Sequence, residues 1–262
     1  MLDRLSRRIR SWIGQDTHLD TSSSFTEGDI YPDDTFIVSF PRSGNSFLQH
    51  LICNYLHPEG FENTYSVIPD LHMNPGRTRE IDRPRLIKSH AAEVQPYPRV
   101  IYVARDGRDV AISYHAFLIR AGVLDDDVSF ASFLPRFCTG EFEYGRWGDH
   151  VNTWLDVSMS THVVRYADML DDGATELRRV LEFLDRDPDS DRIEHAVEAS
   201  QFDRLHQREK KNLDGDGVPD EKKFFFRKGL KKQWESTFTN EMNELFLETN
   251  GEALHRLGFL PY

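Results

Sequence analysis

The chain has 262 residues, a hydrophobic content of 39% and a formal net charge of −12, which suit a soluble protein with one sizeable core. Its acidic balance would repel nucleic acid, so a nucleic-acid partner is not expected. No apolar run is long enough to cross a bilayer and no N-terminal apolar block resembles a signal peptide, so we expect a cytoplasmic protein without a membrane span.

Residues 1–30 are predicted to form an N-terminal extension that precedes one domain over residues 31–262. The segment LDRLSRRIRSWI near the start is basic and amphipathic. This pattern is typical of a terminal helix packed on the protein body and also of a helix lying on a membrane surface. Packing on the body is the favoured interpretation.

The stretch from Thr35 to Phe47, TFIVSFPRSGNSF, predicts an apolar strand, a short loop of small and polar residues, and the start of a helix. The helix is indicated by apolar residues that recur on one helical face, namely Phe47, Leu48, Leu51, Ile52, Tyr55 and Leu56. The N–H groups of such a loop and first turn, together with the helix dipole, favour a bound anion. Arg42 adds a full charge and five donors. The GxxxxGK[ST] pattern of nucleoside-triphosphate loops is not matched, because its lysine is missing.

Three further strands are predicted, and helix-like segments follow the first, third and fourth strands of the chain. These three strands cover Arg85–Lys88, Val100–Ala104 and His162–Tyr166. The alternation favours an α/β fold with a central parallel sheet flanked by helices. Helical spacing also appears over Ala174–Leu184, from Ile193 onward, and over Asn240–Leu257. In the last of these, Gly251 is the expected weak point.

Lys88, Ser89 and His90 end the second predicted strand. A cation and an imidazole two residues apart on an extended chain point to the same side. Ligands of open α/β sheets bind at these carboxyl ends of the strands. A neutral imidazole beside a cation keeps a low pKa and can accept a proton, as a general base must. A purely structural histidine is the alternative interpretation.

Two more basic clusters follow later in the chain. The third strand leads into RDGRDVAIS, in which Arg105 and Ser113 are about two helical turns apart on one face, so both could reach one phosphate. Local pairing of Arg105 with Asp106 or Asp109 is the alternative. Near the C-terminus, FFFRKGLKKQW places Arg227 and Lys228 before a glycine, which indicates an anion site or a solvated turn.

These four clusters, in this order, resemble the cytosolic-type sulfotransferase family, which uses 3′-phosphoadenosine 5′-phosphosulfate (PAPS) as its sulfuryl donor. The resemblance runs from Thr35 to Thr239. It implies a P-loop-like fold, PAPS as co-substrate, 3′-phosphoadenosine 5′-phosphate (PAP) as product, and no metal. By this resemblance the loop at Ser39–Phe47 holds the 5′-phosphosulfate, whereas Tyr102–Ser113 and Arg227–Gly229 hold the 3′-phosphate.

The resemblance also implies a role for individual residues. His90 is the expected general base, Arg42 and Lys88 neutralise charge on the leaving oxygen, and Ser113 binds the 3′-phosphate and restrains Lys88. Donor contacts are expected from Arg42, Ser43, Gly44, Asn45, Ser46, Phe47, Arg105, Ser113, Tyr166, Ser200, Phe202, Phe225, Phe226, Arg227, Lys228 and Gly229. His90 and His150 are the expected acceptor-side residues. For Phe202 and His150 a place in the core is an equal alternative.

The chain departs from the family pattern at several positions. Arg42 stands where cytosolic members usually have lysine, and Phe47 replaces a tryptophan. Asn45 and Ser46 replace a threonine pair but remain short polar groups able to bond phosphate oxygens. The Thr-Val dimer element is replaced by Thr239 and Asn240, so the sequence leaves the oligomeric state open.

No metal site is predicted. Cys53 and Cys138 lie far apart without metal-ligand spacing, so we expect two buried thiols. The stretch NLDGDGVPDE, residues 212–221, lacks the ligand spacing of a calcium loop and is predicted to be an acidic lid over the nucleotide.

The acceptor is predicted to be a small apolar or amphipathic alcohol or phenol. The segments expected to form its walls are rich in aromatic residues, such as Phe130, Phe133, Phe137, Phe142 and Tyr144. The same side chains could equally be core. Two other functions stay open, a PAPS- or PAP-binding protein of the same fold without transferase activity, and a P-loop-like phosphotransferase.

Overall fold

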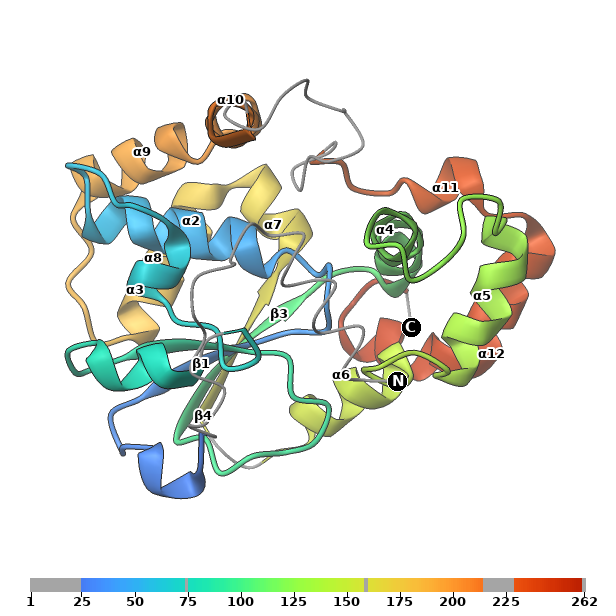
Figure 1. The fold of residues 1–262 in the computed structure, drawn as a ribbon, viewed down its shortest axis with the longest axis horizontal. Helices are drawn as coiled ribbons and strands as arrows, with labels where there is room; N and C mark the ends of the chain where they lie inside the picture. Colours follow the sequence, from blue (N-terminus) through green and yellow to red (C-terminus); the bar gives the residue numbers. More distant parts are fainter. Residues whose placement is uncertain (1–24, 74, 158–159, 214–228, 261–262) are drawn as a thin grey trace.

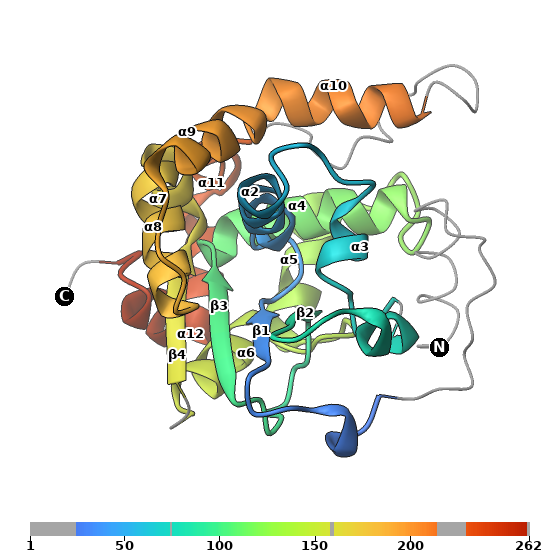
Figure 2. The ribbon, with the colours of Figure 1, turned by 90° about the vertical axis from the view of Figure 1, so that its left-hand side faces the viewer.

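The computed structural model describes residues 25–73, 75–157, 160–213 and 229–260. A parallel sheet with the strand order β2-β1-β3-β4 lies at the centre of these residues (Figures 1 and 2). Its strands are β1 (Thr35–Val38), β2 (Leu86–Ser89), β3 (Arg99–Ala104) and β4 (Ser160–Arg165). The α/β class and the central parallel sheet predicted from the sequence are therefore confirmed.

The register aligns the carboxyl ends of the strands along one edge of the sheet. Val38 pairs with Ser89 on β2 and with Tyr102 on β3, while Ala104 pairs with Arg165 on β4. The loop after β1, and the residues that directly follow β2, β3 and β4, therefore start side by side at this edge (Figure 2). The basic residues at or after the ends of these strands, Arg42, Lys88 and Arg105, therefore lie at this edge.

One face of the sheet is covered by α2 (Asn45–Leu56), α8 (Gly173–Phe183) and α9 (Ser190–Ala199), with α3 (Thr64–Val67), α7 (Tyr166–Asp171) and α10 (Phe202–Leu213) beside them. Most of the predicted apolar stripe of α2 is buried, with Leu48, Leu51 and Ile52 at most 1% exposed, whereas Phe47 and Leu56 at its ends are half-buried. The helices predicted from Ala174 and Ile193 are present within three residues of their expected starts.

The opposite face is covered by α4 (Gly107–Arg120), α5 (Phe130–Thr139), α6 (Trp147–Leu155) and α12 (Asn240–Arg256), with the short α11 (Trp234–Thr237) nearby. The connection from β2 to β3 contains no helix and crosses this face, where Tyr97 stacks on Phe36 and Trp154. None of the described helices is long and apolar enough to cross a membrane.

The predicted weak point at Gly251 is wrong, because α12 continues through it to Arg256. Thr239 caps the helix start by accepting from the N–H of Met242. Phe246, Ala253 and Leu254 on either side of the glycine are fully buried. This packing outweighs the roughly 1 kcal/mol that glycine costs inside a helix. Cys53 and Cys138 are buried free thiols, as predicted.

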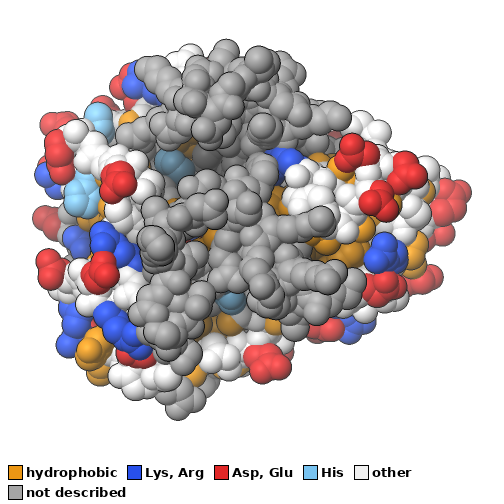
Figure 3. All heavy atoms as spheres, viewed as in Figure 1, with side chains coloured by type: hydrophobic (Ala, Val, Ile, Leu, Met, Phe, Trp, Pro, Cys, Tyr) orange, Lys and Arg blue, Asp and Glu red, His pale blue; other side chains and the backbone are white. Residues whose placement is uncertain are grey.

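The surface carries mixed charge with an acidic excess. In the view of Figure 3, acidic side chains crowd the right-hand edge, where Figure 1 places α5 and α12. The basic N-terminal segment noted in the sequence lies outside the described residues. Its packing therefore stays a prediction.

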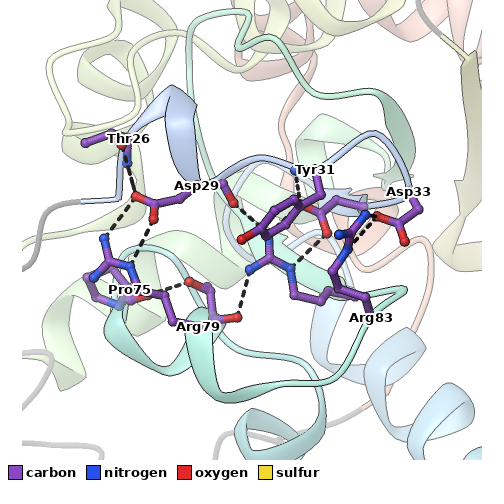
Figure 4. A network of polar contacts seen from close by, with 10 residues as sticks. Thr26, Asp29, Tyr31, Asp33, Pro75, Arg79 and Arg83 are labelled. Carbon is purple, nitrogen blue, oxygen red and sulfur yellow. Dashed lines mark hydrogen bonds and ion pairs between the residues drawn. The ribbon is translucent and has the colours of Figure 1, made fainter.

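At the amino ends of the strands, buried charges join the segment before β1 to the segment before β2 (Figure 4). Arg85 Nε and Nη2 bond the two carboxylate oxygens of Asp34 at 2.8 and 2.6 Å, and both side chains are at most 2% exposed. The Arg85 guanidinium also donates to the carbonyls of Thr78 and Asp29. These contacts tie η1 (Glu27–Asp29) and η2 (Pro75–Glu80) to the sheet.

Replacing Arg85 with alanine is expected to lower the free energy of unfolding by about 3 kcal/mol, because it leaves the buried Asp34 carboxylate without its counter-charge. Chemical denaturation measures the change. Arg83→Ala is the matched control, since its ion pair with Asp33 is exposed and should contribute little. Equal losses in the two variants would contradict the assigned role of the buried pair.

Candidate functional site

The loop after β1 forms an anion cradle at the carboxyl edge of the sheet. Arg42 and Gly44 have φ values of 72° and 101°, which turn the loop before α2 begins at Asn45. Gly44 is the helix N-cap and provides no side-chain cap. Within the described residues, the N–H groups of Gly44, Asn45 and Ser46 have no hydrogen-bond partner. Three donors at the positive end of the helix dipole suit a bound phosphate or sulfate.

Gly44 also allows the ring of Tyr166 to pack directly on this loop. A Cβ atom at position 44 would lie 2.4 Å from Tyr166 Cδ2, well inside van der Waals contact. Tyr166, the first residue of α7, also contacts Phe47 at 6.1 Å between ring centroids. The structure therefore brings Gly44, Phe47 and Tyr166 together, three residues that the sequence assigned to one ligand.

Gly44→Ala should lower the free energy of unfolding by more than Gly60→Ala does. Both glycines have positive φ values, 101° and 110°, so an alanine pays a backbone cost of about 1–2 kcal/mol at either site. Only position 44 adds a clash, because nothing lies within 4 Å of a Cβ at position 60. Denaturant melts of the two variants give the difference. If their losses were equal, Tyr166 would not be packed on the loop as described.

The side chain of Asn45 does not face the cradle, contrary to its predicted role. Its amide donates to the Ile37 carbonyl at 3.3 Å and to Ser39 Oγ at 3.0 Å, and its Oδ1 accepts from Gln49. The side chain lies beneath the loop and fastens α2 to β1. Asn45 can contribute only its backbone N–H to an anion, and Ser43, 1% exposed, is likewise buried.

Arg42 lies between two other predicted anion ligands. Its Nε donates to Ser113 Oγ at 3.2 Å, and its carbonyl accepts from Arg105 Nη1 at 3.4 Å. Its guanidinium lies over the ring of Phe117, 5.3 Å from the centroid. Ser113 on α4 is thus bonded to Arg42, whereas the sequence predicted a bond to Lys88.

Arg105 directly follows β3 and is 9% exposed. Its guanidinium lies 4.8 Å from the Tyr166 ring centroid and donates to the Leu230 carbonyl at 3.0 Å. The alternative, in which Arg105 pairs with a neighbouring aspartate, holds only in part. Asp106 pairs with Arg108 instead, and the Asp109 carboxylate lies 3.8 Å from Arg105 Nη2. The buried Nε of Arg105 has no hydrogen-bond partner among the described residues. This unsatisfied donor is consistent with an anion ligand.

The C-terminal basic cluster is described only from Gly229. That glycine has a φ of 55°, and a Cβ there would lie 2.6 Å from Phe202 Cδ2, so the two predicted ligands are in contact. Phe225, Phe226, Arg227 and Lys228 lie outside the described residues, as does most of the predicted acidic lid. Arg105 and Tyr166 line a cavity of about 370 Å³ together with Lys231, Lys232 and Trp234.

Lys88 is the second cation at this edge. Its Nζ lies 2.6 Å from Asp70 Oδ2, and both side chains are largely buried. Burial alone would lower the pKa of Lys88, but the Asp70 charge outweighs it and the pKa is raised. No motif in the sequence points to Asp70, which lies on a loop outside β2.

His90 follows β2 and is held in a defined tautomer. Its Nδ1 lies 2.7 Å from the Ser39 carbonyl oxygen, which can only accept, so Nδ1 carries the proton and Nε2 carries a lone pair. Burial, and secondly the Lys88 charge, lower the pKa of His90 well below the usual value. The ring contacts Tyr144 and His72. The imidazole is therefore neutral at neutral pH and able to accept a proton.

Two predicted ligand residues lie in the interior instead. His150 is 1% exposed, its Nδ1 bonds the Tyr102 hydroxyl at 3.0 Å, and its ring packs on Phe40. Burial lowers its pKa to about 3. The core alternative fits this burial, and the acceptor-side role of His150 stays a prediction. Ser200 is fully buried and accepts from Asn54 at 2.9 Å, and its predicted contact with the donor stays a prediction.

Of the aromatic residues expected to form the acceptor walls, some lie in the core and others lie at its margin. Phe133 and Phe137 are at most 1% exposed and belong to the core. Phe130, Phe142 and Tyr144 are partly exposed at its margin, and Tyr144 contacts His90 at 5.9 Å between ring centroids. In the described part of the chain, no group of three or more His, Cys, Asp or Glu side chains could hold a metal ion.

Sequence reasoning missed three groups at this site, namely the Ser39 carbonyl, Asp70 and His72. A backbone carbonyl leaves no signal in the residue type. Asp70 and His72 come from an irregular segment before η2, where no periodic pattern indicates which residues approach β2. Only the fold brings them to Lys88 and His90.

The chain is similar to known proteins along most of its length. The family model of the sulfotransferase domain matches residues 32–258. Sulfotransferase 1A1 of Bos taurus is 31% identical over 244 residues, which cover 83% of this chain and 82% of the relative. Sulfotransferase 1E1 of Bos taurus is 28% identical over 84% of this chain and 83% of its own length.

Two solved structures share the fold. Retinol dehydratase in complex with androsterone and inactive cofactor PAP superposes with a TM-score of 0.74 and 18% identity, over 97% of this chain and 88% of that chain. Mouse sulfotransferase SULT7A1 complexed with PAP superposes with a TM-score of 0.63 and 22% identity, over 86% of this chain and 90% of that chain. With the family model matched along most of its length, the chain belongs to the sulfotransferase domain family.

Proposed function

We propose that the chain transfers the sulfuryl group of PAPS to the hydroxyl, or amine, of a small acceptor in one in-line step and releases PAP. Membership of the sulfotransferase family supports the reaction class. The observation that carries the proposal is the His90 tautomer, which places a lone pair on Nε2 at the edge where Arg42 and Lys88 supply positive charge. No covalent enzyme intermediate is required.

In this mechanism His90 Nε2 accepts the acceptor proton while the acceptor oxygen bonds to sulfur. The bond from sulfur to the bridging oxygen breaks, and its electron pair leaves with PAP. Arg42, Lys88 and the N–H groups of Gly44, Asn45 and Ser46 offset the charge that develops on the phosphosulfate oxygens. The donors are already in place, so little reorganisation accompanies the step.

The other end of the donor would contact Arg105. Its unsatisfied Nε and its contact with Tyr166 suit a 3′-phosphate next to a stacked adenine. Phe47, Phe202 and Gly229 complete the proposed nucleotide contacts, together with Arg227 and Lys228 outside the described residues. Selection of PAPS over ATP follows from recognition of that second phosphate.

The proposed acceptor is a small apolar or amphipathic alcohol or phenol. Tyr144, a partly exposed aromatic side chain, contacts the base, and Phe142 is partly exposed at the margin of the same core. Both support an apolar pocket. Solved structures of retinol dehydratase contain androsterone or retinol, both small alcohols. The proposed domain spans residues 31–262, with residues 1–30 as an extension.

Two alternatives are less well supported. A protein that binds PAP without transferring sulfate has no need for a histidine held in the tautomer of a base. A P-loop-like phosphotransferase would need the lysine that the loop lacks.

Isothermal calorimetry with PAP, ATP and GDP is the experiment that tests the donor. We expect PAP to bind and ATP and GDP to bind far more weakly. Transfer of labelled sulfate from PAPS to a panel of apolar alcohols and phenols then tests the reaction. Tight binding of ATP with no binding of PAP would overturn the proposal.

A further inference from the structure

Asp70 contacts Lys88 directly and is linked to His90 through His72, although it belongs to no motif. Its side chain is 1% exposed. Oδ2 accepts from Lys88 Nζ at 2.6 Å, and Oδ1 accepts from the backbone N–H groups of His72 and Met73 at 2.8 and 3.2 Å. One carboxylate thus holds a catalytic cation and shapes the turn that follows it in the chain.

That turn reaches the proposed base. His72 Nε2 accepts the backbone N–H of His90 at 2.8 Å, and the two rings stack with centroids 6.0 Å apart. His72 must be neutral to accept this bond, and burial lowers its pKa in agreement. Asp70 therefore acts on His90 through His72, by fixing the backbone from which the base projects.

The backbone around Asp70 is itself anchored to β2. Lys88 N–H donates to the Pro69 carbonyl at 2.8 Å, and Leu71 N–H donates to the Lys88 carbonyl at 3.0 Å. These two bonds form a parallel bridge between Asp70 and Lys88 outside the named strands. The backbone of Asp70 is thereby fixed beside Lys88, the residue with which its carboxylate pairs.

We propose that Asp70 is a positioning residue of the transfer site, which holds the Lys88 ammonium for the leaving group and, through His72, fixes the turn that carries His90. This inference rests on the function proposed above. It adds a residue whose part in the reaction is indirect, because Asp70 needs to touch neither substrate.

The charges around Lys88 indicate what the loss of Asp70 would do. The groups that face this ammonium are Asp70, Tyr65 at 5.6 Å from its ring centroid, His72, His90 and Arg42. Asp70 supplies the negative charge in this set, and Arg42 opposes it. Burial alone would lower the pKa of Lys88, so an uncharged residue at position 70 should make Lys88 titrate at a lower pH.

The test compares Asp70→Asn with the intact full chain by NMR. The ¹³Cε signal of Lys88, assigned by its absence in Lys88→Arg, is followed as a function of pH. We expect its titration to move down by about one pH unit or more in Asp70→Asn. Asp34→Asn is the matched control, because it removes an equally buried carboxylate from an ion pair at the far end of the sheet. It should leave the Lys88 titration unchanged.

Kinetics with PAPS and an acceptor found in the screen provide the second readout. Asp70→Asn should reduce kcat by up to about 100-fold, the loss that a misplacement of about 1 Å can cause, with little change in the Kd for PAP. The alkaline limb of the kcat profile should move down by the same shift as the NMR titration. A merely structural role would lower thermal stability without lowering kcat or moving the alkaline limb of its pH profile.

The two proposals fail in different ways. Wild-type protein that neither binds PAP nor transfers sulfate overturns the proposed function, and with it this role of Asp70. An active wild type combined with an Asp70→Asn variant of unchanged kcat overturns the Asp70 proposal alone, whether or not the Lys88 titration moves. If Asp70→Asn fails to fold, Asp70→Glu tests the Asp70 proposal instead, because it keeps the negative charge but moves it by one methylene group. We then expect a kcat about tenfold lower, and a wild-type kcat overturns the proposal.

Discussion

His90→Ala is expected to lower kcat for sulfuryl transfer by about 10²- to 10⁴-fold, the range that a positioned general base contributes. The reason is specific to this histidine, since its Nδ1 proton is committed to the Ser39 carbonyl and its Nε2 is left to accept. The Kd for PAP should remain close to that of the wild type, because the base faces the acceptor. Rates are measured with saturating PAPS, and PAP affinity by calorimetry.

The pH dependence of the same rate gives an independent check. The pKa of His90 is lowered well below 6.5, so the imidazole stays neutral as the pH falls through 6.5 and protonates only in more acidic solution. The acid limb of the kcat profile should therefore lie below pH 6.5. An acid limb at or above that value would contradict the assignment.

His195→Ala is the matched control for this variant. His195 is an exposed residue of α9, on a helix that contributes no residue to the proposed site. Its removal should leave kcat and PAP affinity unchanged. If His90→Ala transferred sulfate as fast as His195→Ala, another group would have to remove the acceptor proton.

The sheet and the order of the basic clusters could be predicted because their signals are local. A strand of apolar residues followed by small and charged ones is visible at Thr35–Ser46 and at Val100–Ser113 without knowledge of the fold. The parallel arrangement then follows from the alternation of strands and helices. Since the carboxyl ends of parallel strands meet at one edge, clusters far apart in the chain could be expected to converge.

The direction of individual side chains could not be predicted in the same way. Asn45 follows the loop directly and is a short polar residue, yet its amide is used up by the Ile37 carbonyl and Ser39. His150 and Ser200 likewise have the residue types of ligands but lie inside the protein. Residue type records what a side chain can bind, whereas the helix phase decides whether it faces the site.

Contacts between residues far apart in the chain could not be predicted from the sequence either. Asp70 lies 18 residues before Lys88, on a stretch without periodicity, and no spacing rule links the two. Their contact depends on the path of the chain between α3 and η2. The same holds for Arg42 and Ser113, which are 71 residues apart and meet only because β1 and β3 are neighbours.

Arg42→Ala and Arg42→Gly should both lower kcat by about 10²- to 10³-fold, the loss seen when a preorganised group that offsets transition-state charge is removed. The guanidinium is preorganised by its bond to Ser113 and its place over Phe117. Arg42→Lys keeps a charge but loses the Nε bond, so its rate should be intermediate. Saturating PAPS separates this effect on the chemical step from any loss of donor affinity.

The stabilities of the two uncharged variants identify the cause of the lost rate. Arg42 has a φ of 72°, a conformation that costs a residue with a Cβ about 1–2 kcal/mol and glycine almost nothing. Arg42→Gly should therefore be more stable than Arg42→Ala in denaturant melts, while the two are equally slow. A glycine variant that recovered activity would show that loop strain, and not the guanidinium charge, limits the reaction. Equal inactivity at unequal stability places the effect on the charge that Arg42 holds beside the breaking bond.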